Sequence, residues 1–110
     1  MNEEYRKVEI EEASERLGMG NDFIERLIKK FLESDMLDNA SQAFASANVA
    51  DAKIAIHTIK GAAANIGLTG LSKLALDIET PIKEREYLDL DLFNLMKRVW
   101  GELMETFRVN

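Results

Sequence analysis

Apolar residues recur every three or four positions along most of the chain, with polar residues between them. This spacing places the apolar side chains on one side of an α-helix. No long stretch alternates apolar and polar residues as a half-buried strand does, and runs of β-branched residues are missing. The pattern therefore predicts an all-α protein.

The first half of the pattern predicts a short helix followed by a long one. The short helix covers about residues 9–17, and two glycines end it. Gly20 or Asn21 caps the long helix. Its stripe contains Phe23, Ile24, Leu27, Ile28 and Phe31. We expect this helix to continue almost unbroken to about Ala47, although the Ser34-Asp35 pair could start a new one.

The next helix contains the most informative part of the sequence. Asn48 is a typical N-cap, and Asp51 lies in the first turn, where the helix dipole favours a negative charge. The helix is predicted to run to about Ile66, where Gly67 supplies a left-handed C-cap.

Two further helices complete the chain. Thr69 is placed to cap the first of them, and Pro81 should limit or kink it, because proline removes a hydrogen bond and clashes with the preceding turn. Asp89 or Asp91 then caps the last helix. Amphipathic helices joined by short links favour an antiparallel bundle.

Composition narrows the class of protein. The chain has 110 residues, 46 % of them hydrophobic, so we expect one core and a single domain over residues 1–110. The formal net charge of -6 disfavours nucleic acid and anionic membranes as partners, because both attract clustered Lys and Arg. No apolar run is long enough to span a bilayer, and the start does not resemble a signal peptide. Cysteine is absent, which excludes disulfides and Cys-ligated metals, and we expect a cytoplasmic protein.

The single histidine, His57, does not lie on the apolar stripe of its helix. At about 100° per residue, the apolar face collects Ala52, Ala55, Ile56, Ile59, Ala62, Ala63 and Ile66. His57 lies nearly opposite, and it shares its side with Ala50, Lys53, Lys60, Gly61 and Ala64. A lone histidine is usually structural or merely solvated, but a structural one would lie on the apolar face.

The exposed face of a helix normally carries long charged side chains. The face around His57 has few of them, and we call it the bare surface. Ala50, Gly61 and Ala64 are small, and only two lysines border the histidine. A mid-helix glycine costs about 1 kcal/mol relative to alanine, which indicates a compensating benefit at Gly61. We interpret the bare surface as room for another macromolecule to reach the imidazole. The alternative is that Gly61 permits close helix packing, although it lies only about 40° from His57.

An unprotonated imidazole nitrogen is a nucleophile near neutral pH, provided that the other ring nitrogen keeps its proton. If the helices on either side of Gly67 are antiparallel, His57 faces about Ile78 or Glu79. Glu79 lies at the margin of the apolar stripe, and we predict that it accepts a hydrogen bond from Nδ1–H and leaves Nε2 free to attack phosphorus. The alternative for Glu79 is an exposed surface glutamate.

Two lysines flank the histidine. Lys60, one helical turn after His57, is placed to reach a phosphoryl oxygen or a partner's carboxylate by electrostatic attraction. Lys53 offers a weaker version of the same contact, with a plain surface lysine as the alternative.

The stretch from His57 to Gly67 resembles the signature of histidine-containing phosphotransfer (HPt) domains, His-x-x-Lys-Gly followed by small residues and a helix-ending glycine. The similarity covers roughly residues 9–108, and Asn48 stands where members of that family often have an aspartate cap. The resemblance implies an antiparallel, up-and-down four-helix bundle with an additional short N-terminal helix and an exposed histidine on a central helix.

The functional implications of the resemblance concern partners. It implies that His57 accepts a phosphoryl group from the aspartate of one response-regulator receiver domain and donates it to another. Glu79 would orient the ring, and Ala50, Lys53, Gly61 and Ala64 would contact the partner. A hybrid sensor histidine kinase is a further candidate partner. Mg²⁺ would belong to the receiver, so no cofactor or metal is expected on this chain.

Other interpretations remain open. The phosphorylated module of a chemotaxis-type kinase has a similar histidine motif. A non-catalytic adaptor bundle would bind through an apolar groove, for which Met19, Met36 and the Leu88–Leu90 segment are candidates, although edge packing is the simpler explanation. A carboxylate-based hydrolase or metal enzyme is disfavoured, since the chain lacks a second histidine and a clustered acid pair. It has no glycine-rich phosphate loop or kinase signature, and we expect a phosphocarrier rather than an autonomous enzyme.

Overall fold

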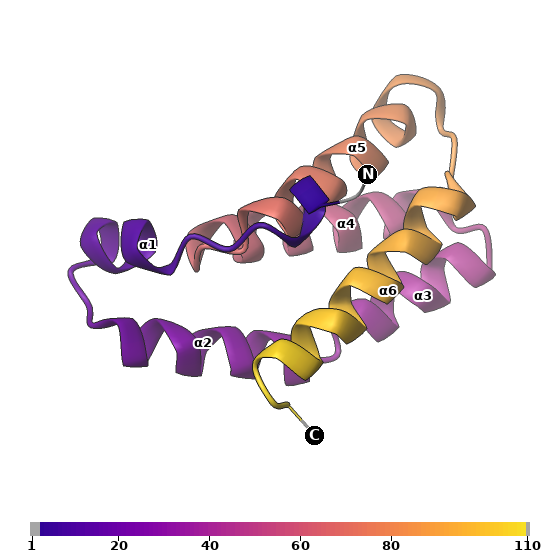
Figure 1. Ribbon diagram of the computed structural model, residues 1–110. Coiled ribbons are helices and arrows are strands. Elements are labelled where there is room, and N and C mark those ends of the chain that lie inside the picture. Colours follow the sequence, from indigo (N-terminus) through magenta and orange to yellow (C-terminus); the bar gives the residue numbers. More distant parts are fainter. Residues whose placement is uncertain (1–2, 110) are drawn as a thin grey trace.

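A computed structural model describes residues 3–109, which form α-helices and one short 3-10 helix and contain no strand (Figure 1). The elements are η1 (Glu3–Arg6), α1 (Ile10–Leu17), α2 (Asn21–Glu33), α3 (Met36–Ala45), α4 (Val49–Asn65), α5 (Thr69–Arg85) and α6 (Leu90–Thr106). The all-α prediction is confirmed. None of these described helices combines the length and the apolar character that a membrane span requires.

The predicted long helix after Gly20 is instead two helices, so the expectation of a near-continuous element to Ala47 is wrong. Ser34 ends α2 with an extended backbone, at φ -71° and ψ 170°. Its hydroxyl donates to the carbonyl of Phe31 at 2.6 Å, and it accepts from the backbone N–H of Met36 at 3.5 Å. A serine side chain competes with the helix for backbone partners in this way.

Helices α4 and α5 form an antiparallel hairpin that makes the most extensive contact between elements (Figure 1). The predicted cap at Asn48 is confirmed, since its Oδ1 accepts from the N–H of Asp51 at 3.0 Å. Gly67 follows the helix with φ +88°, as predicted. Thr69 does not cap α5; it is the first helical residue, and its hydroxyl donates to the carbonyl of Lys7 at 3.4 Å.

Pro81 does not end α5, which continues to Arg85. Proline removes one backbone hydrogen bond from the helix. Ile78 and Ile82, one on either side of Pro81, are both buried, and this packing keeps the second half of the helix in place. The last helix begins at the first of its two predicted caps, because Asp89 accepts from the N–H of Leu92 at 3.0 Å.

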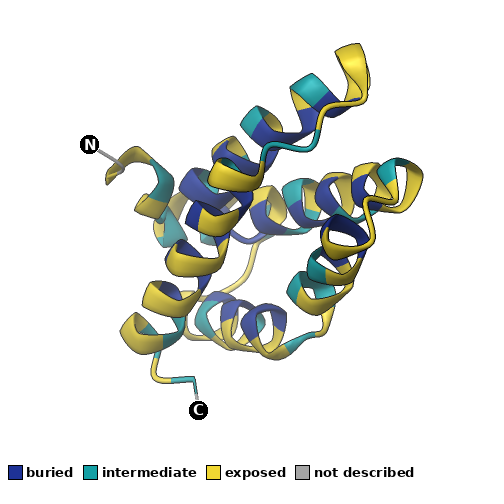
Figure 2. Cartoon of the chain, turned by 90° about the vertical axis from the view of Figure 1, so that its right-hand side faces the viewer, coloured by how far each residue is buried: buried dark blue, intermediate teal, exposed yellow. Residues whose placement is uncertain are grey.

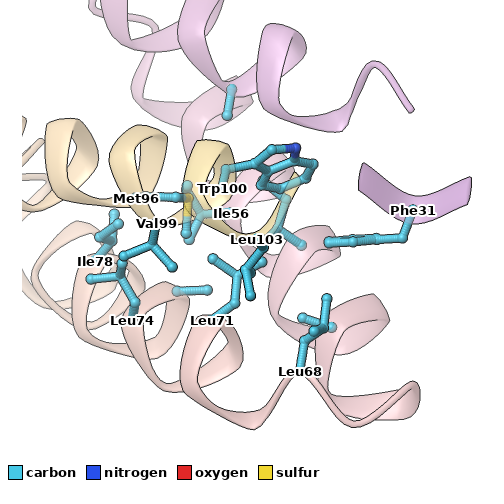
Figure 3. Close-up of a cluster of buried hydrophobic side chains, with 14 of the residues drawn as sticks. Phe31, Ile56, Leu68, Leu71, Leu74, Ile78, Met96, Val99, Trp100 and Leu103 are labelled. Atoms are coloured by element: carbon cyan, nitrogen blue, oxygen red, sulfur yellow. The ribbon is translucent and has the colours of Figure 1, made fainter. Parts of the chain in front are cut away.

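The core lies between the helices, whose buried sides face inward while the exposed sides face solvent (Figure 2). Its centre combines side chains from α2, α4, α5 and α6 and from the turn before α5 (Figure 3). They include Phe31, Ile56, Leu68, Leu71, Leu74, Ile78, Met96, Val99, Trp100 and Leu103. The indole Nε1–H of Trp100 donates to the carbonyl of Leu32 at 3.0 Å, which satisfies one of the carbonyls left free at the end of α2.

Residues 3–9, which we call the N-terminal strap, pack against α5 and the turn before it. The backbone N–H of Gly70 donates to the carbonyl of Lys7 at 3.0 Å, and the phenol of Tyr5 donates to Asp77 at 2.5 Å. A Cβ at Gly70 would lie 2.4 Å from the carbonyl oxygen of Glu4. Only glycine therefore lets the strap approach this closely.

Candidate functional site

His57 projects from the solvent side of α4, and 65 % of its side chain is exposed. Ile56 and Ile59 on the opposite side of the same helix are completely buried. The helical periodicity thus placed the imidazole correctly, and the ring is not part of the core.

The bare surface around the ring is present in the structure. Ala50, Gly61 and Ala64 are exposed, and so is Lys53. Apart from its chain neighbours and the backbone of its own helix, a Cβ built on Gly61 would meet no atom of residues 3–109 within 4 Å. Because no neighbouring helix approaches this position, the packing explanation for Gly61 is wrong.

Glu79 reaches the ring from α5. One of its carboxylate oxygens, Oε2, lies 2.8 Å from Nδ1 of His57. The antiparallel hairpin brings the two residues together as the register argument predicted, but Glu79 is only 1 % exposed, so it is not a surface glutamate. An acidic side chain buried this deeply requires polar partners.

Charge determines the direction of the hydrogen bond. Burial disfavours the charged form of Glu79, but hydrogen bonds from Lys60 and His57 outweigh it and hold the pKa of this carboxyl below its ordinary value of 4.5. An ionised carboxylate can only accept hydrogen bonds. Nδ1 of His57 therefore carries the proton, and the lone pair of the neutral ring is on Nε2.

Lys60 points toward Glu79. Its Nζ donates to Oε1 at 2.6 Å, and 26 % of its side chain is exposed. The two carboxylate oxygens thus hold different partners, one the imidazole and the other the ammonium. The sequence placed Lys60 beside His57 but did not identify this ion pair.

Several contacts that position α4 could not be derived from local patterns. The hydroxyl of Ser72 on α5 donates to the backbone carbonyl of Lys60 at 3.0 Å. Arg16 on α1 donates to the carbonyls of Ala64 and Asn65, at 3.3 and 3.2 Å, and so satisfies the end of α4. The two Arg16 contacts join residues 48 and 49 positions apart, which no local pattern reveals.

An exposed apolar side chain, which the sequence analysis did not single out, lies near the bare surface. Ile54 is 65 % exposed and lies one turn before His57 on α4. It lines a groove between α3 and α4 together with Met36, Asn39, Gln42, Ala43, Ser46, Asp51, Ala55 and Thr58. An isoleucine outside the apolar stripe of its helix was the available signal, since a solvated position rarely favours a large apolar residue.

Within residues 3–109, no three histidine, cysteine, aspartate or glutamate side chains come together as a metal site would require. Of the residues considered for an adaptor groove, Met19 and Leu90 are exposed, whereas Met36 and Leu88 pack partly against the core. The cluster formed by His57, Glu79 and Lys60 joins an exposed imidazole and an ammonium group to one buried carboxylate.

Three comparisons with known proteins gave one match, to a family model. No curated protein and no solved structure gave a match to the chain. The family model of the Hpt domain matches residues 26–107, which include α3 to α6 and all three residues of the cluster. Proteins of this family carry phosphohistidine in two-component phosphorelays. The chain belongs to the Hpt domain family.

Proposed function

We propose that this protein is a phosphorelay intermediate that carries a phosphoryl group on Nε2 of His57 between two receiver domains. The observation that carries the proposal is the exposed imidazole whose Nδ1 is held 2.8 Å from a buried carboxylate. A ring held in this way presents one defined nitrogen to solvent and cannot exchange it for the other without losing the hydrogen bond.

The transfer step follows from that arrangement. The lone pair of Nε2 attacks the phosphorus of an aspartyl phosphate, the Nε2–P bond forms, and the P–O bond to the aspartate breaks. The bonding pair leaves with the aspartate as its carboxylate. The ring keeps its proton on Nδ1 and becomes positively charged, and Glu79 stabilises that charge because it lies in direct contact. In the reverse step an unphosphorylated aspartate attacks the same phosphorus, and the ring leaves neutral.

The surface around His57 suits a receiver domain. The small side chains of Ala50, Gly61 and Ala64 leave room for the rim of a receiver active site to approach the ring. Ile54 adds an apolar contact at one edge, and Lys53 a positive charge. Apolar residues surrounded by polar ones are typical of protein interaction sites.

The domain organisation and the role of the whole chain are also part of the proposal. We infer a single cytoplasmic domain over residues 1–110, built as an antiparallel four-helix bundle with α1 as an additional helix. We also infer that the chain acts as a phosphocarrier rather than as an autonomous enzyme, with the partner receiver domain completing the transfer chemistry. A divalent cation held by the receiver would neutralise the phosphoryl oxygens during transfer.

The decisive experiment follows acid-labile label from a phosphorylated receiver domain to the chain. We expect label on the wild type and none on His57→Gln, with the intrinsic fluorescence of the single tryptophan, Trp100, as the check that the variant is folded. Label on folded His57→Gln would overturn the assignment. An unlabelled wild type would indicate an adaptor, and label arriving only from a kinase catalytic domain would indicate a chemotaxis-type module.

A further inference from the structure

The buried carboxylate of Glu79 divides its two oxygens between two different donors. Oε2 receives the Nδ1–H of His57 at 2.8 Å, and Oε1 receives the ammonium of Lys60 at 2.6 Å. With 1 % of its surface exposed, Glu79 has almost no access to water. Its charge is therefore stabilised mainly by the two groups in direct contact with it.

Two donors on one carboxylate influence each other. If the carboxylate had the imidazole as its only partner, it would favour a second proton on the ring, because an imidazolium would then be the only positive charge in contact with it. A second proton occupies Nε2, which removes the lone pair needed for attack. The ammonium of Lys60 already supplies the positive charge, so the ring does not have to.

We propose that Lys60 is a positioning residue that acts through Glu79: it balances the buried carboxylate and so keeps the ring of His57 neutral, with Nε2 free. This inference rests on the proposed role of His57 as phosphoryl acceptor. It assigns Lys60 a different task from contact with the phosphoryl oxygens, since turning the ammonium away would leave a buried carboxylate without its cation.

The other charged groups near the cluster are few. On α5, Lys83 lies one turn after Glu79 and adds a weaker attraction to the carboxylate. On α4, only Asp51 and Lys53 are charged besides the cluster itself, and both are exposed. The only charged residue of α3, which packs against α4, is the exposed Asp38. Among residues 3–109, Lys60 is the only lysine or arginine that forms an ion pair with Glu79.

Nuclear magnetic resonance can test the inference on the protein alone, because the chain has one histidine. The ring nitrogen shifts of His57 are followed against pH in the wild type, Lys60→Met, Lys60→Arg and Lys53→Met. We expect the protonation midpoint of the ring to move to higher pH in Lys60→Met and to stay near that of the wild type in Lys60→Arg and Lys53→Met. An unmoved midpoint in Lys60→Met overturns the proposal.

A second background separates an effect through Glu79 from a direct effect of the ammonium on the ring. In Glu79→Gln the buried charge is gone, so Lys60→Met should leave the ring midpoint where Glu79→Gln alone has it. An equal shift in both backgrounds would mean that Lys60 acts on the ring directly, which contradicts the proposal. If Lys60→Met alone fails to fold, the comparison of Glu79→Gln with the double variant Glu79→Gln/Lys60→Met can still be made, because the double variant buries no unpaired carboxylate.

Transfer rates give an independent readout. If Lys60 acts through Glu79, the pH profile of phosphoryl transfer to Lys60→Met moves to higher pH, and its rate approaches the wild-type rate on the alkaline side. A loss by the same factor at every pH would instead indicate contact between Lys60 and the phosphoryl group, and would refute the inference. Absence of transfer to the wild type would count against the proposed function, while the ring titration would still decide the role of Lys60.

Discussion

Gly61 and Gly101 provide a matched pair of substitution sites. Each lies in the interior of a 17-residue helix, α4 or α6, and is exposed. A Cβ added to either would meet no atom within 4 Å. They differ in one respect, because Gly61 lies on the bare face beside His57 and Gly101 lies on another helix.

The expected change in stability can be worked out from helix propensity. Arginine is close to alanine as a helix former, and glycine in a helix interior is about 0.8–1 kcal/mol less favourable. Since neither site is crowded, Gly61→Arg and Gly101→Arg should each stabilise the fold by about that amount. For a domain of roughly this size the melting temperature should rise by about 4–8 °C.

The rate of phosphoryl transfer should differ between Gly61→Arg and Gly101→Arg. We expect Gly61→Arg to slow phosphoryl transfer from a receiver domain sharply, because the long side chain occupies the space that the partner needs, while Gly101→Arg transfers like the wild type. Thermal denaturation followed by circular dichroism measures the stability, and the rate of label transfer measures the function. Equal rates for two stabilised variants would refute the bare-surface argument. Loss of stability in Gly61→Arg would refute the claim of open space.

Three further outcomes follow from the structure. The folded pKa of Glu79 lies below 4.5, so its ion pair with Lys60 and its hydrogen bond from His57 contribute fully above that pH and are lost as the pH falls through the folded pKa. The excess stability of the wild type over Glu79→Gln in urea titrations should shrink there. Trp100→Phe leaves the buried carbonyl of Leu32 without its donor and should lower the free energy of unfolding by about 1–3 kcal/mol in the same titration. Gly70→Ala should lower the melting temperature, because its Cβ would overlap the backbone of Tyr5; an unchanged melting temperature would show that the strap yields without loss.

Local chemistry was enough to predict the parts of the fold that depend on neighbouring residues. The caps at Asn48 and Asp89 follow from a side chain that bonds the backbone three residues on. The orientation of His57 follows from helical periodicity, and its proximity to Glu79 from the short turn between two antiparallel helices. Each of these features is decided within one helix or one hairpin.

The features that the sequence analysis missed have two causes. Either a side chain competes with the helix for backbone hydrogen bonds, or the contact joins residues far apart in the sequence. Ser34 breaks the long helix because its hydroxyl bonds the carbonyl of Phe31, an outcome that the apolar stripe does not reveal. Thr69 donates its hydroxyl to the strap rather than capping α5. The ion pair between Lys60 and Glu79 depends on how deeply the carboxylate is buried, which the sequence placed only at the margin of the core.

The N-terminal strap is attached to the α4–α5 hairpin mainly through its backbone. The N–H of Glu9 donates to the carbonyl of Gly67 at 2.8 Å, and the N–H of Gly70 donates to the carbonyl of Lys7. The side chains of Lys7 and Glu9 can therefore be replaced without breaking these hydrogen bonds. Gly67 and Gly70 cannot be replaced in the same way, because a Cβ on either would lie too close to the backbone of the strap. A protein trimmed to residues 26–107, where the family match lies, would keep both glycines and lose the segment that they accommodate.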